Sequence, residues 1–312
     1  MKVIVVGAGQ TGSIYGAGAH ENGHEVLFVD ASQEIVDKIN ADGLTIDRQD
    51  GGGVYRIPAT TAPTGAGGPA DLVLFQVKGY STRVAAENVK PSVGPGTLIV
   101  TLQNGLGNEE ALRDVFPANK LSIGITLNTV VTVGVARYQL AVPRGSKVGP
   151  TRGEDLADAA RIASVFERPG MPAEVLPEKE IRTAQWSKFA FNCGGLAAWS
   201  LAHLTIVGSR DQPLLIDLME AIIRETCEIA ALEGIVLDAE DSVGFLRNLV
   251  ATAPGGRASM LGDILAKRRT EIDTINGAAV MFADKHHHPA VLNRAMVALV
   301  KGLEKAIEIG EA

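Results

Sequence analysis

A lysine in the second half of the chain has the surroundings of a proton donor. Lys188 lies in the apolar segment WSKFAFN, and Asn192 is four residues further on, so on a helix the two side chains share one face. A lysine on a largely buried face has a lowered pKa and can donate a proton near neutral pH. Taken alone, the pattern is more typical of a lysine whose stem covers apolar surface while its ammonium reaches solvent.

A candidate carboxylate lies closer to the C-terminus. Thr270–Asp273 matches a capping box, which predicts a helix over 271–286 with Glu271 in its first turn. The helix dipole stabilises a negative charge there, and this is a sufficient structural reason for the glutamate. The Asn276-Gly277 pair is poor helix material, so its place inside this helix predicts a packing or polar-contact role.

Two uncharged polar residues are further candidates. Asn104 follows the predicted buried strand 97–102, and ligands of doubly wound sheets bind at the carboxyl ends of strands. Asn-Gly is also a common turn, so Asn104 alone supports a binding role and a turn equally. Ser259 opens a predicted helix over 257–268, and packing against the next helix would account for it.

The first half of the chain contains a glycine motif. The segment GAGQTG at residues 7–12 has the spacing G-x-G-x-x-G, follows a predicted strand and opens a predicted helix. In that context the motif binds the pyrophosphate of a dinucleotide, because the helix N-terminus offers free N–H groups and partial positive charge. A glycine-rich turn of an ordinary α/β sheet is the structural alternative. The loop residues predicted to hold the cofactor are Gly7, Gly9, Gln10, Thr11 and Gly12.

An acidic residue ends the second predicted strand. Asp30 follows residues 25–29, and a carboxylate there accepts hydrogen bonds from the adenosine ribose hydroxyls of NAD. NADP would need a cation for its 2′-phosphate, and residues 31–37 offer none. We therefore expect NAD, with NADP as the alternative. Capping of the next helix by Asp30 or by Ser32 is a structural explanation that is compatible with this role.

These candidates need a sheet and a helical region to position them. Short β-branched runs that alternate with helical segments predict βαβ units and a parallel sheet in the first half. The β-rich stretch 120–150 predicts antiparallel or edge strands, and helical periodicity dominates after it. The predicted strands are 2–6, 25–29, 71–77 and 97–102, and the predicted helices are 10–22, 32–40, 81–90, 178–193, 211–233, 239–252, 257–268, 271–286 and 290–309.

The fold class that follows is α/β with two domains. We expect a Rossmann-type doubly wound NAD(P)-binding domain over 1–176 and an all-α substrate domain over 177–312. The use of glycine agrees with this division. Most of the 35 glycines lie in the first region, where the phosphate loop and the tight turns need them.

Composition and charge exclude several classes of protein. The net charge of −7 and the shortness of every basic run argue against a nucleic-acid partner. Cys193 and Cys227 lack metal-ligand spacing and fit a reducing compartment, so we expect a cytoplasmic protein. The uncharged stretch 189–209 contains polar residues and two adjacent glycines, which predicts a buried helix and a turn rather than a membrane span. Residues 286–288 are histidines at a predicted helix end, and we predict no metal site there.

Taken in order, the motifs resemble those of the ketopantoate reductase (2-dehydropantoate 2-reductase) family. The resemblance covers essentially the whole chain, and its last block is the most specific. It implies a Rossmann domain followed by a helical domain, and reduction of a 2-oxo acid to the D-2-hydroxy acid with NAD(P)H. The matches are Gly7–Gly12, Lys78 after a strand, Gln103–Gly107, Lys188 with Asn192, and Ser259-Met260 followed by Thr270–Asp273 and Ile275–Gly277.

The resemblance implies a role for each matched side chain. Lys188 would be the general acid that protonates the ketone oxygen, and Glu271 would help to orient the substrate and the lysine. Asn104 would hold the lysine or the nicotinamide end of the cofactor. The remaining implied roles are a hydrogen bond to the substrate from Asn192, a contact to the substrate carboxylate from Ser259 and a cofactor-side position for Lys78.

Three positions depart from the family pattern. Leu196 and Gly256 stand where the family usually or often has substrate-binding asparagines, and Asp30 stands near a position where most of the family has a basic residue for NADP. Loss of hydrogen-bonding partners weakens selection for a hydroxyl-bearing substrate. The departures point to an NAD-dependent relative that acts on a less polar, branched or aromatic 2-oxo acid, as in a D-mandelate-type dehydrogenase branch.

Other functions share the same architecture. A β-hydroxyacid dehydrogenase would show a glycine-rich substrate motif at the end of its nucleotide domain, and an opine-type dehydrogenase would need a marked histidine–aspartate pair. A non-catalytic NAD-binding regulator would keep residues 7–12 and could lose Lys188, Glu271 and Asn104, all of which are present. The resemblance is also compatible with a homodimer, which the residue pattern does not establish.

Overall fold

The chain divides into two compact units. The computed structural model describes residues 1–49, 51–63, 68–153, 155–253 and 255–311. Residues 1–103 and 108–181 form the first unit, and residues 104–107 and 182–312 form the second. The division falls within helix α6 (Glu178–Leu201), a few residues after the predicted domain boundary at 176, which stays a prediction.

The first unit is built on an eight-stranded sheet. Its strands are β1 (Lys2–Val6), β2 (Glu25–Val29), β5 (Ala59–Thr60), β6 (Leu72–Phe75), β7 (Leu98–Thr101), β8 (Leu121–Thr126), β11 (Ser146–Pro150) and β12 (Ala173–Val175). They lie in the order β12-β11-β8-β7-β6-β1-β2-β5. Every neighbouring pair is parallel except β8 and β11. This mostly parallel order confirms the predicted Rossmann-type fold.

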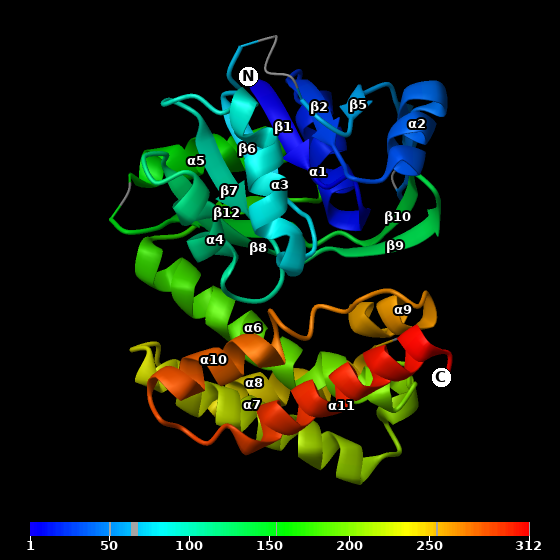
Figure 1. Cartoon of the computed structure of the whole chain (residues 1–312), viewed down its shortest axis with the longest axis vertical. Coiled ribbons are helices and arrows are strands. Elements are labelled where there is room, and N and C mark those ends of the chain that lie inside the picture. Colours follow the sequence, from blue (N-terminus) through cyan, green and yellow to red (C-terminus); the bar gives the residue numbers. More distant parts are fainter. Residues whose placement is uncertain (50, 64–67, 154, 254, 312) are drawn as a thin grey trace. The chain divides into compact units, whose positions relative to one another are not determined.

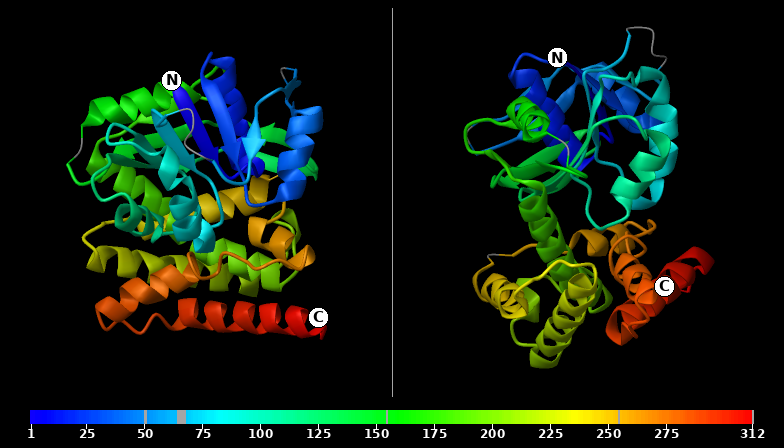
Figure 2. Two further views of the ribbon diagram at one scale, coloured as in Figure 1. Left: turned by 45° about the horizontal axis from the view of Figure 1, so that its top comes forward. Right: turned by 90° about the vertical axis from the view of Figure 1, so that its left-hand side faces the viewer.

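Helices cover both faces of this sheet, as a doubly wound fold requires. Alternate residues of β1 belong to different cores. Val3 and Val5 share one core with residues of α1 and α5. Ile4 and Val6 share the other with residues of α3 and α4. The right-hand view of Figure 2 shows the cyan α3 and the green α5 on opposite sides of the sheet. The helices of this unit are α1 (Gln10–Glu21), α2 (Gln33–Asp42), α3 (Thr82–Val89), α4 (Asn108–Val115) and α5 (Leu156–Phe166), with single 3-10 turns at Gly79–Ser81 and Lys90–Ser92.

Part of the β-rich stretch 120–150 belongs to a second, four-stranded sheet. Its strands are β3 (Leu44–Asp47), β4 (Gly53–Tyr55), β9 (Thr129–Gly134) and β10 (Arg137–Val142), in the order β4-β3-β10-β9. The antiparallel prediction is confirmed for β9 with β10 and for β11 with β8. Strand β8 also pairs with β7, in parallel, so it lies inside the first sheet and joins its parallel and antiparallel parts. All but the last residue of β8 are buried, as in parallel strands covered on both faces.

The second unit is helical (Figure 1). Besides most of α6 it contains α7 (Pro213–Leu232), α8 (Ala239–Thr252), α9 (Ser259–Leu265), α10 (Asn276–Lys285) and α11 (Val291–Ile309), with a 3-10 turn at Val207–Ser209. In both views of Figure 2 the orange α10 lies beside the red α11. One core of buried apolar side chains joins these helices.

Helix α6 is longer than predicted. The predicted helix stops at residue 193, just before Gly194 and Gly195, whereas α6 continues through both glycines to Leu201. A Cβ on Gly194 would lie 2.5 Å from Ile223 of α7, and one on Gly195 would lie 2.4 Å from the ring of Trp199. The two glycines therefore allow close packing in the middle of the helix rather than breaking it.

Helix α10 starts later than predicted. Residues 271–275 form turns, in which the N–H groups of Thr274 and Ile275 both donate to the Glu271 carbonyl, and α10 begins at Asn276. The predicted helix from 271 with Glu271 in its first turn is therefore wrong. The N–H and hydroxyl of Thr270 donate to Glu304 of α11, each at 2.7 Å, so a distant helix and not a capping box holds this segment.

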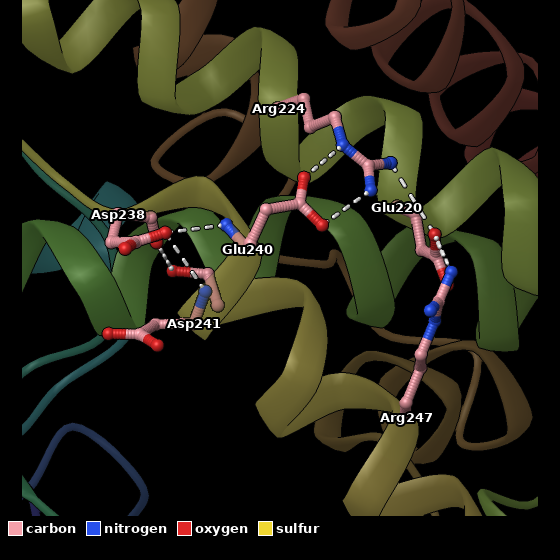
Figure 3. Close-up of polar contacts among 7 residues, drawn as sticks. Glu220, Arg224, Asp238, Glu240, Asp241 and Arg247 are labelled. Atoms are coloured by element: carbon pink, nitrogen blue, oxygen red, sulfur yellow. Dashed lines mark hydrogen bonds and ion pairs between the residues drawn. The ribbon is translucent and has the colours of Figure 1, made fainter.

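Ion pairs join α7 to α8 on the surface of the second unit (Figure 3). Buried Glu220 accepts two hydrogen bonds from Arg247, at 2.5 and 2.8 Å, and one from Arg224. Arg224 also donates to Glu240.

Among the described residues, no helix is long and apolar enough to cross a bilayer.

Candidate active site

The glycine motif forms a loop between β1 and α1 that has room for a phosphate. A Cβ on Gly7 would lie 2.7 Å from the Gln76 carbonyl oxygen, and one on Gly12 would lie 1.9 Å from the Gly7 carbonyl oxygen. A Cβ on Gly9 would meet nothing within 4 Å. The first and third glycines therefore serve close packing, whereas the second faces open space that a pyrophosphate can approach.

Two further observations fit a bound dinucleotide at this loop. Within the described part of the chain, no side chain caps the N-terminus of α1, which leaves its first N–H groups for an anion, with Gln10 and Thr11 in its first turn. Beside the loop, the buried Nε2 of Gln76 has no hydrogen-bond partner among the described atoms. An unpaired donor next to an uncapped helix end suits an acidic ligand.

Side chains fix the loop through the peptide group of Ala8. The Ala8 N–H donates to Asp30 at 2.7 Å, while its carbonyl accepts from the hydroxyls of Ser13 at 2.8 Å and Tyr138 at 2.9 Å. Burial, with the charge of Asp30 as the next cause, raises the pKa of Tyr138 to about 12, so its hydroxyl stays a donor. The sequence does not single out Tyr138, because nothing local in a β-rich segment marks a tyrosine that reaches a distant loop.

Asp30 lies where the sequence places it, at the end of β2. One carboxylate oxygen accepts from Ala8 and the other from the N–H of Ser32 at 2.9 Å. Ser32 itself caps α2 by accepting from Ile35. The carboxylate is therefore held against the glycine loop, and the side chain that caps α2 is that of Ser32.

Lys78 follows β6 at the same edge of the sheet. Gln76 N–H donates to the Val6 carbonyl, so the segment after β6 runs beside the glycine loop, and Lys78 is partly buried two residues later. The buried Gln103 amide donates to the Val77 carbonyl at 2.7 Å and to the Thr82 hydroxyl at 2.8 Å. Gln103 thus fixes the backbone next to Lys78, a role that the sequence does not predict.

In the second unit, Lys188 and Glu271 interact electrostatically. Lys188 is partly buried on α6 and Glu271 is buried in the turns before α10. Burial lowers the pKa of the Lys188 ammonium to about 8, and the negative charge of Glu271 opposes that shift. Such a lysine carries a proton at neutral pH and releases it readily, which is what a general acid needs.

The loop that carries Asn104 packs with the same unit. Leu106 N–H donates to the Thr274 carbonyl at 3.0 Å, and Leu106 is part of the core of this unit. Gly105 has φ +81°, and a Cβ on it would lie 2.1 Å from the Thr274 oxygen, so only glycine allows this approach. Asn104, partly buried, is thereby fixed next to the segment that carries Glu271.

Asn192 and Ser259 differ in their surroundings. Asn192 is buried on α6, one turn after Lys188. Ser259 is the first residue of α9 and its side chain is exposed. The substrate contacts predicted for both stay predictions.

Asn276 confirms the polar role expected of the Asn-Gly pair. It is fully buried, and its Nδ2 donates to the Cys193 carbonyl of α6 at 3.0 Å and to Asn293 of α11 at 2.9 Å.

His286 follows the last residue of α10, and its Nε2 lies 2.5 Å from a carboxylate oxygen of Glu233. The described residues contain no group of three or more metal-binding side chains.

Comparison with known proteins identifies the family. The profile described as "Ketopantoate reductase PanE/ApbA" matches residues 3–153, and its C-terminal counterpart matches residues 180–304. The chain belongs to the ketopantoate reductase family. It is therefore an NAD(P)-dependent oxidoreductase, which excludes the non-catalytic alternative.

Curated relatives match over their whole length. A 2-dehydropantoate 2-reductase of Halobacterium salinarum is 29% identical over 306 residues, covering 96% of this chain and 98% of the relative. A protein of the same name from Pyrococcus horikoshii is 29% identical over 311 residues.

Solved structures agree. A PanE/ApbA family ketopantoate reductase from Ralstonia eutropha has a TM-score of 0.88 at 28% identity, with 99% of this chain and 100% of that chain covered. A ternary structure of D-mandelate dehydrogenase with NADH and anilino(oxo)acetate has a TM-score of 0.92 at 22% identity, with 99% of each chain covered. At that identity the second likeness shows the fold alone.

Proposed function

We propose that this ketopantoate reductase relative reduces a 2-oxo acid to the D-2-hydroxy acid, with Lys188 as general acid. The observation that carries the proposal is the lowered pKa of Lys188, about 8, beside the charge of Glu271. A group with that pKa is protonated at neutral pH and is a stronger acid than an ordinary lysine. It therefore transfers its proton with less of a barrier.

The chemistry asks little of the remaining side chains beyond orientation. When bound, the reduced nicotinamide supplies a hydride to the carbonyl carbon. The carbonyl oxygen then takes up a proton from Lys188 Nζ, and the neutral amine is reprotonated from solvent. Glu271 keeps the ammonium charged and oriented, and Asn104 holds the lysine or the nicotinamide end. Asn192 donates to the substrate, and Ser259 binds its carboxylate.

The cofactor assigned by the proposal is NAD. The backbone around Gly7, Gly9 and Gly12 would hold the pyrophosphate, and Lys78 would lie on the cofactor side. Asp30 supports NAD over NADP because a carboxylate repels a 2′-phosphate. Its orientation toward Ala8 puts that charge at the phosphate loop.

The substrate assigned by the proposal is a branched or aromatic 2-oxo acid. Leu196 lies two helical turns after Lys188 on the same face of α6, and its side chain is buried in an apolar core. Gly256 has φ +109°, a conformation that a side chain rarely adopts. The family resemblance implies an asparagine usually at the first position and often at the second, so a substrate hydroxyl would find fewer partners there.

The test is an assay of NADH and NADPH oxidation over a panel of 2-oxo acids. The panel contains ketopantoate, straight-chain and branched 2-oxo acids and phenylglyoxylate, and chiral chromatography determines the configuration of each product. We expect the highest kcat/KM with NADH and a branched or aromatic substrate, and a D product. A clear preference for NADPH and ketopantoate would overturn the cofactor and substrate assignments. No oxidation with any 2-oxo acid would overturn the reaction.

A further inference from the structure

A chain of buried and partly buried polar contacts runs through the second unit. On α7, Glu225 accepts from the N–H groups of Leu292 and Asn293 at the start of α11, at 2.9 and 2.8 Å. The Asn293 amide also donates to Glu225, and its oxygen accepts from Asn276 at 2.9 Å. Asn276 in turn donates to the Cys193 carbonyl at 3.0 Å. The chain thus ties α7, α11, the start of α10 and α6 together.

The last link joins the two segments that carry the proposed acid–base pair. Cys193 lies next to Asn192, in the turn of α6 that follows Lys188. Asn276 directly follows the turns of residues 271–275, whose first residue is Glu271. The hydrogen bond from the Asn276 side chain to the Cys193 carbonyl therefore links the segment that carries Glu271 to the helix that carries Lys188.

Asn276 has little freedom in this position. Its side chain is fully buried, and both Nδ2 hydrogens are used, one toward α6 and one toward α11. Its Oδ1 has no partner among the described atoms, so the residue bears the cost of a buried unpaired acceptor. A buried polar group with an unpaired acceptor calls for an explanation beyond packing.

Charged groups hold the opposite end of the same segment. Glu304 of α11 accepts from Thr270, and Lys301 of α11 pairs with Asp273 at 2.6 Å, as does Arg269 at 2.9 Å. The contacts with Glu304 and Lys301 attach the segment to α11. Asn276 adds a hydrogen bond from this segment to the backbone of α6, besides the interaction of Glu271 with Lys188.

We propose that Asn276 is a positioning residue that fixes the separation of Lys188 and Glu271. The inference rests on the proposed function for its catalytic meaning. Since the interaction of two charges falls with distance, a looser segment weakens the influence of Glu271 on the lysine. Asn276 thereby sets how readily Lys188 holds its proton, without touching the substrate or the cofactor.

The test measures the titration of Lys188 directly. Competitive labelling of the folded full-length protein with acetic anhydride, read by mass spectrometry of the Lys188 peptide, gives the midpoint without any substrate. In Asn276→Ala we expect the midpoint to move to lower pH, because less of the Glu271 charge reaches the ammonium. At a fixed pH above the midpoint, a midpoint that is lower by one pH unit means a protonated fraction about tenfold smaller. If Asn276→Ala does not fold, Asn276→Ser, which keeps one donor, is held to the same criterion.

A double variant and a matched control separate positioning from general loosening. Glu271→Gln defines the full displacement of the midpoint, and adding Asn276→Ala to it should produce no further movement, since the charge is already gone. Thr226→Val removes a buried hydroxyl that contacts Asn293 and leaves the Asn276 amide intact, so it should lower the Tm without moving the midpoint. A wild-type midpoint in Asn276→Ala, or an equal displacement in Thr226→Val, would overturn the proposal.

The kinetic readout is kept separate from the labelling. If the panel of 2-oxo acids supports turnover, Asn276→Ala should lower kcat while KM for NADH stays near the wild-type value. If no 2-oxo acid is reduced but the labelling midpoint moves as expected, the proposed function fails and the positioning role stands. A loss of NADH affinity in Asn276→Ala with an unchanged midpoint would count against the role.

Discussion

The glycine loop of residues 7–12 and the site of Lys188 and Glu271 depend on different structural features. In the loop of residues 7–12, Gly7 and Gly12 leave no room for a Cβ, whereas Gly9 faces open space. The lysine site depends on side chains, Lys188 and Glu271, whose burial and charge set a pKa. A large anionic ligand is best held by N–H groups that need room, whereas a proton transfer needs a tuned acid. A larger side chain should therefore impair the glycine loop, whereas loss of a side chain should impair the site of Lys188 and Glu271.

The largest effect is expected from removal of the lysine. Lys188→Ala should lower kcat by about 10²–10⁴-fold, the usual worth of a positioned acid, and leave the NADH Kd unchanged. Steady-state kinetics and NADH fluorescence titration measure the two quantities. The control is Lys305→Ala on the exposed face of α11, which should behave as the wild type. Turnover near wild type in Lys188→Ala would remove Lys188 from its role.

The glycine loop allows the converse test. Gly12→Ala places a Cβ 1.9 Å from the Gly7 oxygen, so the backbone must move and both Tm and NADH binding should fall. Gly9→Ala meets nothing in the protein, so its Tm should stay unchanged. Its NADH Kd should rise about tenfold or more, as for the loss of one charge-assisted hydrogen bond. Unchanged NADH affinity in Gly9→Ala would show that no phosphate approaches there.

The pH dependence should report the lysine. Burial holds the pKa of Lys188 at about 8, and the general acid must be protonated for reduction. The kcat for reduction should therefore be level below that value and fall about tenfold per pH unit above it. Glu271→Gln removes the charge that raises the pKa, so the fall should begin at lower pH. A fall that begins at higher pH in this variant would contradict the pairing.

A side chain that supports the backbone loop should have a smaller effect. Tyr138→Phe removes one of two hydroxyl donors to the Ala8 carbonyl, a bond of about 0.5–1.5 kcal/mol. NADH affinity should fall a few-fold and kcat should change little. Tyr55→Phe is the matched control, because its hydroxyl donates to Glu21 and not to the loop. Equal effects of the two variants would mean that the loop is held by other contacts.

The ion pairs of α7 and α8 should contribute stability without chemistry. Hydrogen bonds from Arg247, and then its charge and Arg224, hold the pKa of Glu220 below its ordinary 4.5. Ionised Glu220 therefore stabilises the fold above that value, and the contribution is lost as pH falls through the lowered pKa. Glu220→Gln should cost about 1–2 kcal/mol in urea unfolding at pH 7, less at pH 3, with unchanged kcat.

The exposed Glu240 provides the control for that comparison. Glu240→Gln should cost well below about 1 kcal/mol, because its side chain is largely exposed. A change in kcat for either variant would mean that these ion pairs affect catalysis as well as stability.

The sequence predicted the parts of the molecule that depend on local patterns. Strand β1, the glycine loop and α1 follow from a buried β-branched run and a fixed glycine spacing, and each lies within a residue or two of its expected place. Asp30 lies at the predicted end of β2, since a parallel strand delivers its next residue to the sheet edge. The membership of Lys188 in a buried helix likewise followed from apolar neighbours.

The failures have tertiary causes. Thr270, just before the turns at 271–275, is held by Glu304, 34 residues later, so a local capping box was the wrong explanation. Gly194 and Gly195 resemble a helix stop because their partners, Ile223 and Trp199, are not visible in a local window. Tyr138 and Gln103 act on loops distant in the chain. Such contacts become visible only when the fold brings the segments together.

The loop of residues 104–107 has a consequence for how the protein can be divided. It packs with the helical unit although it follows β7 in the sequence. A fragment starting at 182 would keep Lys188 and Glu271 but lose Asn104, and the loss of Leu106 would open a hole in its core. No single cut yields the complete helical unit. Chimeras that exchange C-terminal halves between relatives must therefore transplant this short loop as well.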